Sequence, residues 1–501
     1  MSRRQLHGPT RRNVVVGAIA SFGLSSGCQA RAPMTIGLFP RGVAIDIPPH
    51  VDQVSTTGFA EAGVGAATYR YDPAIGGTEH AERPSSTFRT KDGRFFRLEP
   101  QAELDLTTVG MRVGLADGHA ASNAAVLREA LALSQTVVFP AGTIDLRLPG
   151  GFGLPGRDGL TIRGQGWMTQ VVGGGAIFSM PSVANFHLVD LWLLQTTNDG
   201  PAIQSYHCNL RNIRLTRVKI SVRDKAVSQQ NCISIVVDRS PVAADGIAGL
   251  AGLAIKDCLF EPGRMGVEIQ NHGDGERVYR YRDIVVEGTT IAKTAPVNGM
   301  GISLSGWGST CRIRNNRFVD CTGPGVEIVG ADDATIEGNH FVGSLGTPVA
   351  ISNTRVVKGC RIVDNKVTGA PPVGLFIEAA DGVTITGNDL STAGAFVIKA
   401  RHVDIIGNRL TAIGTAQLFQ IDHARNVKIE HNVMLSQGGQ DGLAMIVVFN
   451  GSRDCVVRGN RMERRGYDVA NDALWVRQSS DATGIVVQSN QRIGGPKNRA
   501  S

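Results

Sequence analysis

An asparagine recurs through the second half of the chain, each time three residues after an isoleucine or a valine. The residue five positions before it is also apolar, from Cys311 in the first segment to Ile485 in the last. A unit of about 25 residues cannot bury its apolar face alone, so successive units must stack on one another. The asparagines are separated by 23, 26, 23, 20, 24, 28 and 30 residues: Asn316, Asn339, Asn365, Asn388, Asn408, Asn432, Asn460 and Asn490.

Each unit is predicted to be a strand, a sharp bend and a second strand. The positions five and three before the asparagine are two apart, so they point to the same side of a strand. The position just before it is mostly Gly, Asn, Asp or His, which tolerate a left-handed backbone. We therefore expect the asparagines to stack at one inner corner, about 4.8 Å apart, and to form a ladder of amide hydrogen bonds.

The same phase continues upstream without asparagine, at Leu191, Val218, Cys258 and Thr289, and residues 161–167 are read as a further turn. The whole pattern resembles the right-handed parallel β-helix of the pectate-lyase-like superfamily. Residues 114–146 carry an Asp-Gly turn, an amphipathic segment and "PAGT", and they resemble the opening of that superfamily. The resemblance implies an all-β fold: a right-handed parallel β-helix solenoid of about a dozen coils with an N-terminal capping helix.

The expected organisation has four parts. Residues 1–32 are a signal peptide, 33–113 a leader segment, 114–146 the capping helix and first strand, and 147–495 the β-helix. The leader segment resembles those of tailspike-like and bacterial polysaccharide-processing β-helix proteins. An apolar side of the capping helix is formed by Val126, Leu127, Ala130, Leu131 and Leu133, and Ser122 or Asn123 is expected to cap it.

The N-terminal residues favour export. Arg11 and Arg12 precede an apolar run, 14–24, that is too short to span a bilayer and resembles a twin-arginine signal. Cys28 stands where a lipoprotein box would place a lipid, and 30–32 is a rival cleavage site. We expect a periplasmic or extracellular protein whose membrane attachment, if any, is a lipid at Cys28. The seven other cysteines show no metal-binding spacing and are interpreted as buried, unpaired thiols.

The net charge of +7 is spread along the chain rather than gathered in one block. This distribution favours an acidic polysaccharide as partner and argues against nucleic acid, for which a basic, aromatic-interleaved patch would be expected. The leader segments leave a monomer and a homotrimer both open.

The second strand of each coil carries the candidate catalytic residues. In "GVEIQN", "GISLSG" and "GVEIVG" the apolar residues point inward, so Glu268, Ser303 and Glu327 form one exposed outward column. The same pattern in "AFVIKA" predicts that Phe396 and Ile398 point inward. Two carboxylates two coils apart suit the general acid and base of an inverting glycosidase. Loop residues after Glu268 are added as candidates for proton transfer, His272 and Asp274, and for sugar binding, Asn271.

A lyase would need other groups, namely a cation to neutralise the sugar carboxylate and a base for its C5 proton. Arg264, Arg280 and Tyr281 are expected beside the same face, with Ser303 as a further sugar-binding residue. A bound Ca²⁺ is compatible with a lyase, although the sequence shows no metal-ligand set. Asp332 with Asp333 is interpreted as turn chemistry, and Glu378 with Lys399 as a surface ion pair.

The ordered Asn-x-Asp, Asp-Asp, Gly-His-Gly and Arg-x-Lys signature of galacturonases is absent, so no family active site can be transferred. The preferred hypothesis is an exported carbohydrate-active protein that cleaves, by hydrolysis or elimination, or epimerises a polysaccharide. The alternatives are a non-catalytic glycan-binding or structural β-helix and a trimeric adhesin.

Overall fold

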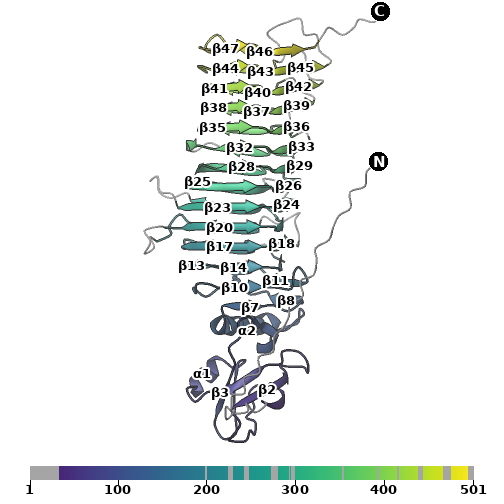
Figure 1. Cartoon of the computed structure of the whole chain (residues 1–501), viewed down its shortest axis with the longest axis vertical. Helices are drawn as coiled ribbons and strands as arrows, with labels where there is room; N and C mark the ends of the chain where they lie inside the picture. The colour runs from purple at the N-terminus through teal and green to yellow at the C-terminus, as the bar shows by residue number, and fades with distance from the viewer. Residues whose placement is uncertain are drawn as a thin grey trace, which may run out of the picture.

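The structure is a computed structural model of the whole chain. It describes residues 33–197, 200–223, 230–241, 248–271, 280–292, 294, 299–351, 355–369, 371–391, 394–413, 417–437, 444–465 and 475–494. A small leader domain sits at one end of a long rod of stacked coils (Figure 1). Among these residues, no helix combines the length and the apolar character needed to cross a membrane.

The leader domain is a five-stranded sheet in the order β1-β2-β3-β5-β4 with one short helix. Aromatic side chains fill its core, where the rings of Phe39 and Phe59 stack 4.7 Å apart and those of Phe88 and Phe96 stack 5.2 Å apart. Its elements are β1 (Met34–Leu38), β2 (Gln53–Gly58), β3 (Thr68–Tyr71), α1 (Gly77–Glu82), β4 (Thr87–Arg89) and β5 (Phe95–Leu98).

The α-helix α2 (His119–Leu133) lies between the leader domain and the coils (Figure 1) and contacts the 3-10 helix η1 (Leu106–Val109). The expectation that Ser122 or Asn123 caps α2 was wrong, because the helix begins after Gly118, whose φ is 77°. Asn123 instead lies fully buried inside the helix. Its amide accepts from the Arg112 backbone N–H at 2.8 Å and donates to the backbone oxygens of Arg112 and Asp145.

Each coil of the rod contributes strands to three faces, which confirms the predicted β-helix. Faces A and B belong to one 29-stranded sheet, and face C is a 14-stranded sheet. All strand pairs of the rod are parallel, each strand pairing with its counterpart in the next coil. Face C consists of β8 (Gly142–Leu146), β11 (Thr169–Gly173), β15 (Trp192–Gln195), β18 (Lys219–Val222), β21 (Leu259–Glu261), β24 (Thr290–Ala292), β26 (Arg317–Val319), β29 (His340–Val342), β33 (Lys366–Thr368), β36 (Asp389–Ser391), β39 (Arg409–Ile413), β42 (Val433–Gln437), β45 (Arg461–Arg465) and β48 (Gln491–Ile493).

Faces A and B meet within the long strands β25 (Met300–Arg314) and β27 (Val326–Asp332), which run across both. The other strands of face A are β9 (Phe152–Gly153), β12 (Phe178–Ser179), β16 (Ile203–Tyr206), β19 (Ile233–Val236), β22 (Met265–Asn271), β30 (Val349–Ile351), β34 (Leu375–Glu378), β37 (Ala395–Ile398), β40 (Phe419–Asp422), β43 (Ile446–Phe449) and β46 (Val476–Gln478). Those of face B are β6 (Leu104–Asp105), β7 (Thr136–Val138), β10 (Thr161–Arg163), β13 (Val183–Ala184), β14 (His187–Val189), β17 (Leu210–Thr216), β20 (Leu250–Lys256), β23 (Tyr281–Glu287), β28 (Thr335–Glu337), β31 (Val357–Lys358), β32 (Arg361–Val363), β35 (Ala380–Thr386), β38 (Arg401–Ile406), β41 (Arg425–Glu430), β44 (Val456–Arg458) and β47 (Val486–Gln488).

The asparagine ladder is present at the corner between faces B and C. From Asn316 to Asn460, each amide nitrogen donates to the amide oxygen of the next asparagine, as Asn388 does to Asn408 at 2.8 Å. It also donates to a backbone oxygen of the preceding coil, and the amide oxygen accepts the backbone N–H of the asparagine before it. The residue before each asparagine is left-handed, with φ of 55° at Asn315 and 68° at Gly387. Thr289 begins the ladder by donating its backbone N–H to Asn316.

The core of the rod is apolar and follows the predicted columns, with Phe318 and Phe341 stacked 4.8 Å apart. One coil was assigned the wrong register. Phe396 and Ile398 were expected inside, but β37 pairs with β34 so that Ala395 and Val397 are buried and Phe396 points outward. The strand starts one residue earlier than expected, and a slip of one residue exchanges the two sides of a strand.

Six of the seven described cysteines are buried free thiols, as expected, and Cys208 is partly exposed. Burial raises the pKa of Cys321 and of Cys360 to about 12, so neither forms the reactive thiolate near neutral pH. In a Cys28→Ser protein at pH 8, we expect one thiol to react rapidly with an aromatic disulfide reagent and six more only after unfolding. Loss of the fast phase in Cys208→Ser would identify it, whereas several fast thiols in the native protein would contradict this packing.

Candidate functional site

Face A brings the predicted carboxylates into one column. Glu268 on β22 pairs in register with Ser303 on β25, which pairs with Glu327 on β27. The column continues towards the leader domain through Ser234 on β19 and Gln204 on β16. The side chains point out of the rod because their neighbours along each strand, such as Val267 and Ile269, fill its core.

Glu268 points outward but is not exposed to solvent as expected, because only 6% of the residue is accessible. Polar neighbours enclose its carboxylate. One oxygen accepts from the Asn231 amide at 2.6 Å and from the Ser234 hydroxyl at 2.8 Å, and the other accepts from the Gln270 amide. The backbone N–H of Met265 donates to the Asn231 amide oxygen at 3.1 Å, which turns the Asn231 nitrogen towards Glu268. The carboxylate is therefore held in one position before any ligand arrives.

Tyr206 lies beside this carboxylate and is 47% exposed. Partial burial raises the pKa of its phenol, the charge of Glu268 raises the pKa further, and a hydrogen bond with Ser234 opposes both. Tyr206 and Gln204 also line a hollow of about 300 Å³ over β9, β12 and β16, together with Met180, Pro181 and Cys208. The site therefore combines a buried carboxylate, a phenol beside it and a concave surface next to the phenol.

Glu327 completes the column. The Ser303 hydroxyl donates to its carboxylate at 3.0 Å, so the Glu327 side chain leans towards the coil that carries Glu268. The two backbones are two strand spacings apart, about 10 Å. Glu268 leans the same way, towards Ser234 one coil earlier, so the separation stays near this backbone spacing, at the upper limit of the roughly 6.5–9.5 Å found in inverting glycosidases.

Several of the other predicted site residues lie elsewhere. Tyr281 was expected beside the site but is buried in the core, where its hydroxyl donates to the Gly306 backbone oxygen at 3.1 Å. Asn271 is also buried and donates to the Trp307 backbone oxygen, so both residues hold the backbone of β25. Asn271 is the last residue of β22 and points inward like Val267 and Ile269, and Tyr281 is the buried first residue of β23.

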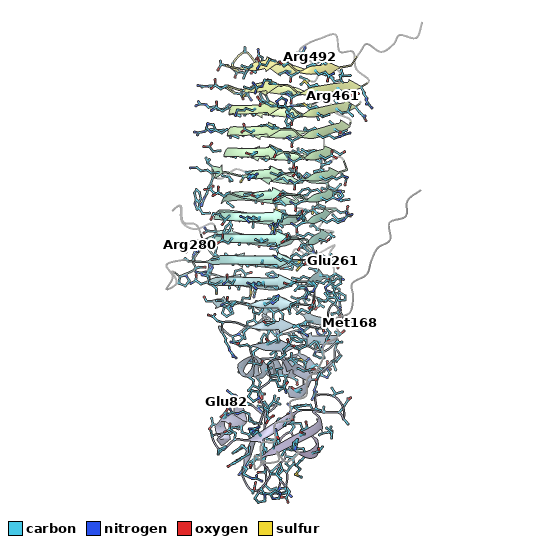
Figure 2. All side chains as sticks on the ribbon, viewed as in Figure 1. Glu82, Met168, Glu261, Arg280, Arg461 and Arg492 are labelled. Carbon is cyan, nitrogen blue, oxygen red and sulfur yellow. The ribbon has the colours of Figure 1, made fainter. Side chains whose placement is uncertain are left out.

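Two predicted arginines lie at the margins of the site. Arg264 is half-buried in the turn before β22, and Arg280 lies at the far edge of the rod, where it donates to the Ser240 backbone oxygen (Figure 2). His272 and Asp274 lie outside the described residues. The two pairs interpreted as structural are so: Asp332 accepts the Lys358 backbone N–H, Asp333 is left-handed, and Glu378 lies 3.9 Å from Lys399.

Four residues of the site were not predicted as site residues from the sequence: Tyr206, Asn231, Ser234 and Gln270. The signal was available in "AIQSYH" (202–207), where Ile203 and Ser205 alternate with outward residues as in "GVEIQN". Extending the outward columns two coils towards the N-terminus would have placed Gln204 and Tyr206 next to the Glu268 column.

Two further features of the described residues bear on the chemistry. No group of three or more His, Cys, Asp or Glu side chains is placed there to hold a metal ion.

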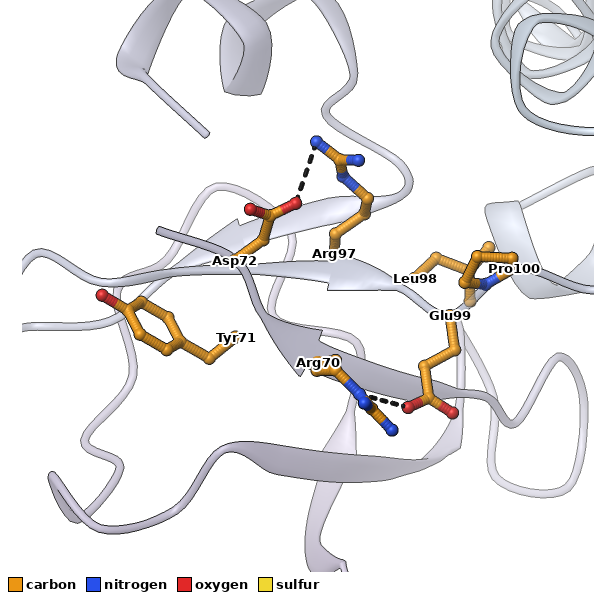
Figure 3. A pocket seen from close by; sticks show the side chains of 7 residues that line it. All are labelled: Arg70, Tyr71, Asp72, Arg97, Leu98, Glu99 and Pro100. Atoms are coloured by element: carbon orange, nitrogen blue, oxygen red, sulfur yellow. Dashed lines mark hydrogen bonds and ion pairs between the residues drawn. The ribbon is translucent and has the colours of Figure 1, made fainter. Parts of the chain in front are cut away.

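A hollow of about 490 Å³ in the leader domain is lined by charged residues, but these pair with one another across β3 and β5 (Figure 3). Arg70 lies 2.9 Å from Glu99 and Arg97 lies 3.0 Å from Asp72, so we place the functional site on face A instead.

The electrostatic link between Tyr206 and Glu268 gives a test of this geometry. We expect the Tyr206 phenol to remain protonated above its ordinary pKa of 10.0, because ionisation would place a phenolate near a carboxylate. Glu268→Gln removes that charge and should lower the pKa, while burial keeps it above the ordinary value. The difference in ultraviolet titration between each protein and its Tyr206→Phe counterpart isolates this phenol. An unchanged Tyr206 pKa in Glu268→Gln would show that the Glu268 charge does not act on this phenol.

Comparison with known proteins agrees with the coil architecture. Residues 252–410 match the family model described as the right handed beta helix region. The stack of coils is a right-handed β-helix. A sequence search among curated proteins finds no match.

Among solved structures, this β-helix is similar to the mannuronan C-5 epimerase AlgE6 A-module of Azotobacter vinelandii, at 14% identity and a TM-score of 0.41 over 77% of this chain and 99% of that chain. It is similar to a mannuronic acid specific polysaccharide family 6 lyase from human gut microbiota, at 14% identity and a TM-score of 0.47 over 66% and 80%. It is also similar to PfbA, a surface adhesin of Streptococcus pneumoniae, at 13% identity and a TM-score of 0.43 over 76% and 91%. Because one architecture serves many functions, function is argued from the side chains of face A.

Proposed function

We propose that the protein is a carbohydrate-active enzyme that binds a polysaccharide along face A and acts on it beside Glu268 and Tyr206. One observation carries the proposal: a buried, pre-positioned carboxylate faces outward next to an exposed tyrosine and a hollow in the same surface. Enzyme sites are where burial and neighbouring charges are arranged to shift pKa values, and the pKa of Tyr206 is raised by both.

Tyr206 suits the role of proton donor. Hydrolysis and elimination both require a group that gives a proton to the departing glycosidic oxygen, and a phenol kept protonated can do so. In a hydrolase, Glu268 and Glu327 supply the pair of carboxylates. The long parallel face above and below these residues provides room for an extended sugar chain.

A non-catalytic glycan-binding role is the second candidate. One observation favours it: the protein's own side chains already donate hydrogen bonds to both oxygens of the Glu268 carboxylate, as they do to a buried carboxylate with a structural role. The donors are Asn231, Ser234 and Gln270. In that case face A would bind a polysaccharide without changing it.

A panel of acidic and neutral polysaccharides separates these functions. A lyase would produce ultraviolet absorbance from new double bonds, a hydrolase would produce reducing ends without that absorbance, and an epimerase would change the sugar composition without cleavage. We expect one of these products from an acidic polysaccharide. Binding without any product across the panel would reject the enzymatic function and support the non-catalytic glycan-binding role.

We further propose that the protein acts outside the cytoplasm, on the basis of Arg11 and Arg12 before the apolar run 14–24. Replacing both arginines by lysine should retain the protein in the cytoplasmic fraction of cells that export the unchanged chain. Equal export of the two proteins would contradict a twin-arginine signal.

A further inference from the structure

Face C carries a row of cations that the proposed site does not use. The residue after each ladder asparagine points outward from this face, and these residues pair in register from one coil to the next. The cationic column consists of Arg317, His340, Lys366, Arg409 and Arg461, interrupted by Asp389 and Val433. Arg461 and Glu261 mark this side of the rod, away from Arg280 (Figure 2).

The positive charge of the column is little compensated within the protein. Arg317 and Lys366 are exposed and form no ion pair among the described residues. Arg409 lies 4.0 Å from Asp389, with both side chains more than half exposed, and Arg461 lies 3.8 Å from Glu463. Pairs so exposed contribute little.

The pKa of His340 is sensitive to the positive charge of the column. Its ring nitrogen Nε2 lies 3.1 Å from the Thr368 hydroxyl. Partial burial lowers the pKa of His340, and the charges of Arg317 and Lys366 lower it further; no carboxylate offsets them. Asp320 and Asp364, the carboxylates nearest along the chain to Arg317 and Lys366, stand in bends next to β26 and β33 and form no ion pair within the described part of the chain. Glu337, three residues before His340, ends β28 on face B.

The charged members Arg317, Lys366, Arg409 and Arg461 stand on alternate coils, with His340, Asp389 and Val433 between them. The ladder beneath fixes this register, so the spacing of the cations along the rod is constant. An anionic partner along the column would offset their charge. The next outward column of face C is largely uncharged, with Val319, Val342 and Thr368 beside the first three members, so the positive surface is about one residue wide.

We propose that the cationic column is a docking surface for a single chain of acidic polysaccharide lying along the rod axis. The coil spacing of about 4.8 Å is close to the length of one sugar ring, so cations on alternate coils can meet the carboxylates of alternate sugars. Single-stranded nucleic acid would need aromatic side chains for base stacking, and the column offers none from Arg317 to Arg461. The partner rests on the proposed function, but the surface is separate from face A.

Binding of polygalacturonate oligomers by the full chain carrying Glu268→Gln tests the proposal independently of catalysis. The triple variant Arg317→Thr, Lys366→Thr and Arg409→Thr should weaken binding by about tenfold to a hundredfold at low salt. It should also reduce the slope of log affinity against log salt by about two, at roughly 0.7 per lost contact. The matched control removes three exposed cations of face B, Arg312→Thr, Arg361→Thr and Arg401→Thr, and should bind within twofold of the parent.

His340 provides a second readout. Its pKa, followed by NMR and assigned with His340→Gln, should rise when the oligomer binds, because the bound carboxylates offset Arg317 and Lys366. The proposal is overturned by unchanged affinity in the triple variant, by an equal loss in the control, by an unmoved His340 pKa, or by tighter binding of DNA or neutral dextran. Inactivity of the unchanged protein on every polysaccharide, with this binding intact, would reject the proposed function alone.

Discussion

Replacing Asn388 by aspartate will lower the free energy of unfolding by about 3–5 kcal/mol, the cost of leaving a buried charge without a partner. The Asn388 amide nitrogen donates to three oxygens, those of Asn408, Ile362 and Thr386, at 2.8–3.0 Å. An ionised carboxylate can only accept, so it would face three acceptors in a corner that is 1% exposed. Repulsion raises the pKa of the new carboxyl, so the loss should shrink as the pH falls and the group becomes a donor.

The same substitution at the end of the ladder is the matched control. Asn490 is half-buried and has an asparagine neighbour on one side only, Asn460. Water can reach an aspartate there, so we expect Asn490→Asp to cost about 1 kcal/mol. Guanidinium unfolding of both variants, with the slope compared as well as the midpoint, measures the difference. Equal losses, or a nearly neutral Asn388→Asp, would show that the ladder does not act as a buried hydrogen-bond network.

Replacing Tyr206 by phenylalanine, or Glu268 by glutamine, will lower the turnover rate on the substrate polysaccharide by about 10²–10⁴-fold, the usual contribution of a general acid or base. Tyr206→Phe removes the proton donor and keeps the ring that lines the hollow. Glu268→Gln keeps the size of the side chain and an acceptor for the Ser234 hydroxyl, while removing the carboxylate that can act as a base. Both variants should therefore bind substrate with little change while losing turnover.

The control for this pair is Glu337→Gln, because Glu337 is an exposed carboxylate on β28 of face B, away from the site. It should retain full turnover, and the unfolding midpoints of all three variants should stay close to that of the parent. Full activity in Tyr206→Phe would remove the proposed proton donor. Full activity in Glu268→Gln would remove the site.

The fold was predictable because the repeat determines which residues stack. Period-two apolar positions, a left-handed bend and a buried amide recur together, and only stacked coils satisfy all three, as the bonds from Asn316 to Asn490 confirm. The predicted register was wrong where nothing in the sequence marks the first residue of a strand. The segment around Phe396 is apolar at four successive positions, so it reads equally well in either phase.

The site was less predictable than the fold. Spacing alone placed Glu268 and Glu327 in one column, but it could not show that Asn231 would cover Glu268 from a turn 37 residues away. The exposed tyrosine came from a strand upstream of the asparagine repeat, where the anchor for alignment is lost. The members of the cationic column could be found in the sequence, since they directly follow the ladder asparagines. Only the register of the coils shows that they line up along one face.

A crystal structure of the Glu268→Gln protein with an oligosaccharide of the substrate bound tests the central claim most directly. The account predicts sugar rings along β16, β19, β22 and β25, with one ring within about 4 Å of the Tyr206 side chain and a glycosidic oxygen near its hydroxyl. Sugar bound on face C alone, with the surface around Tyr206 empty at saturating ligand, would contradict it.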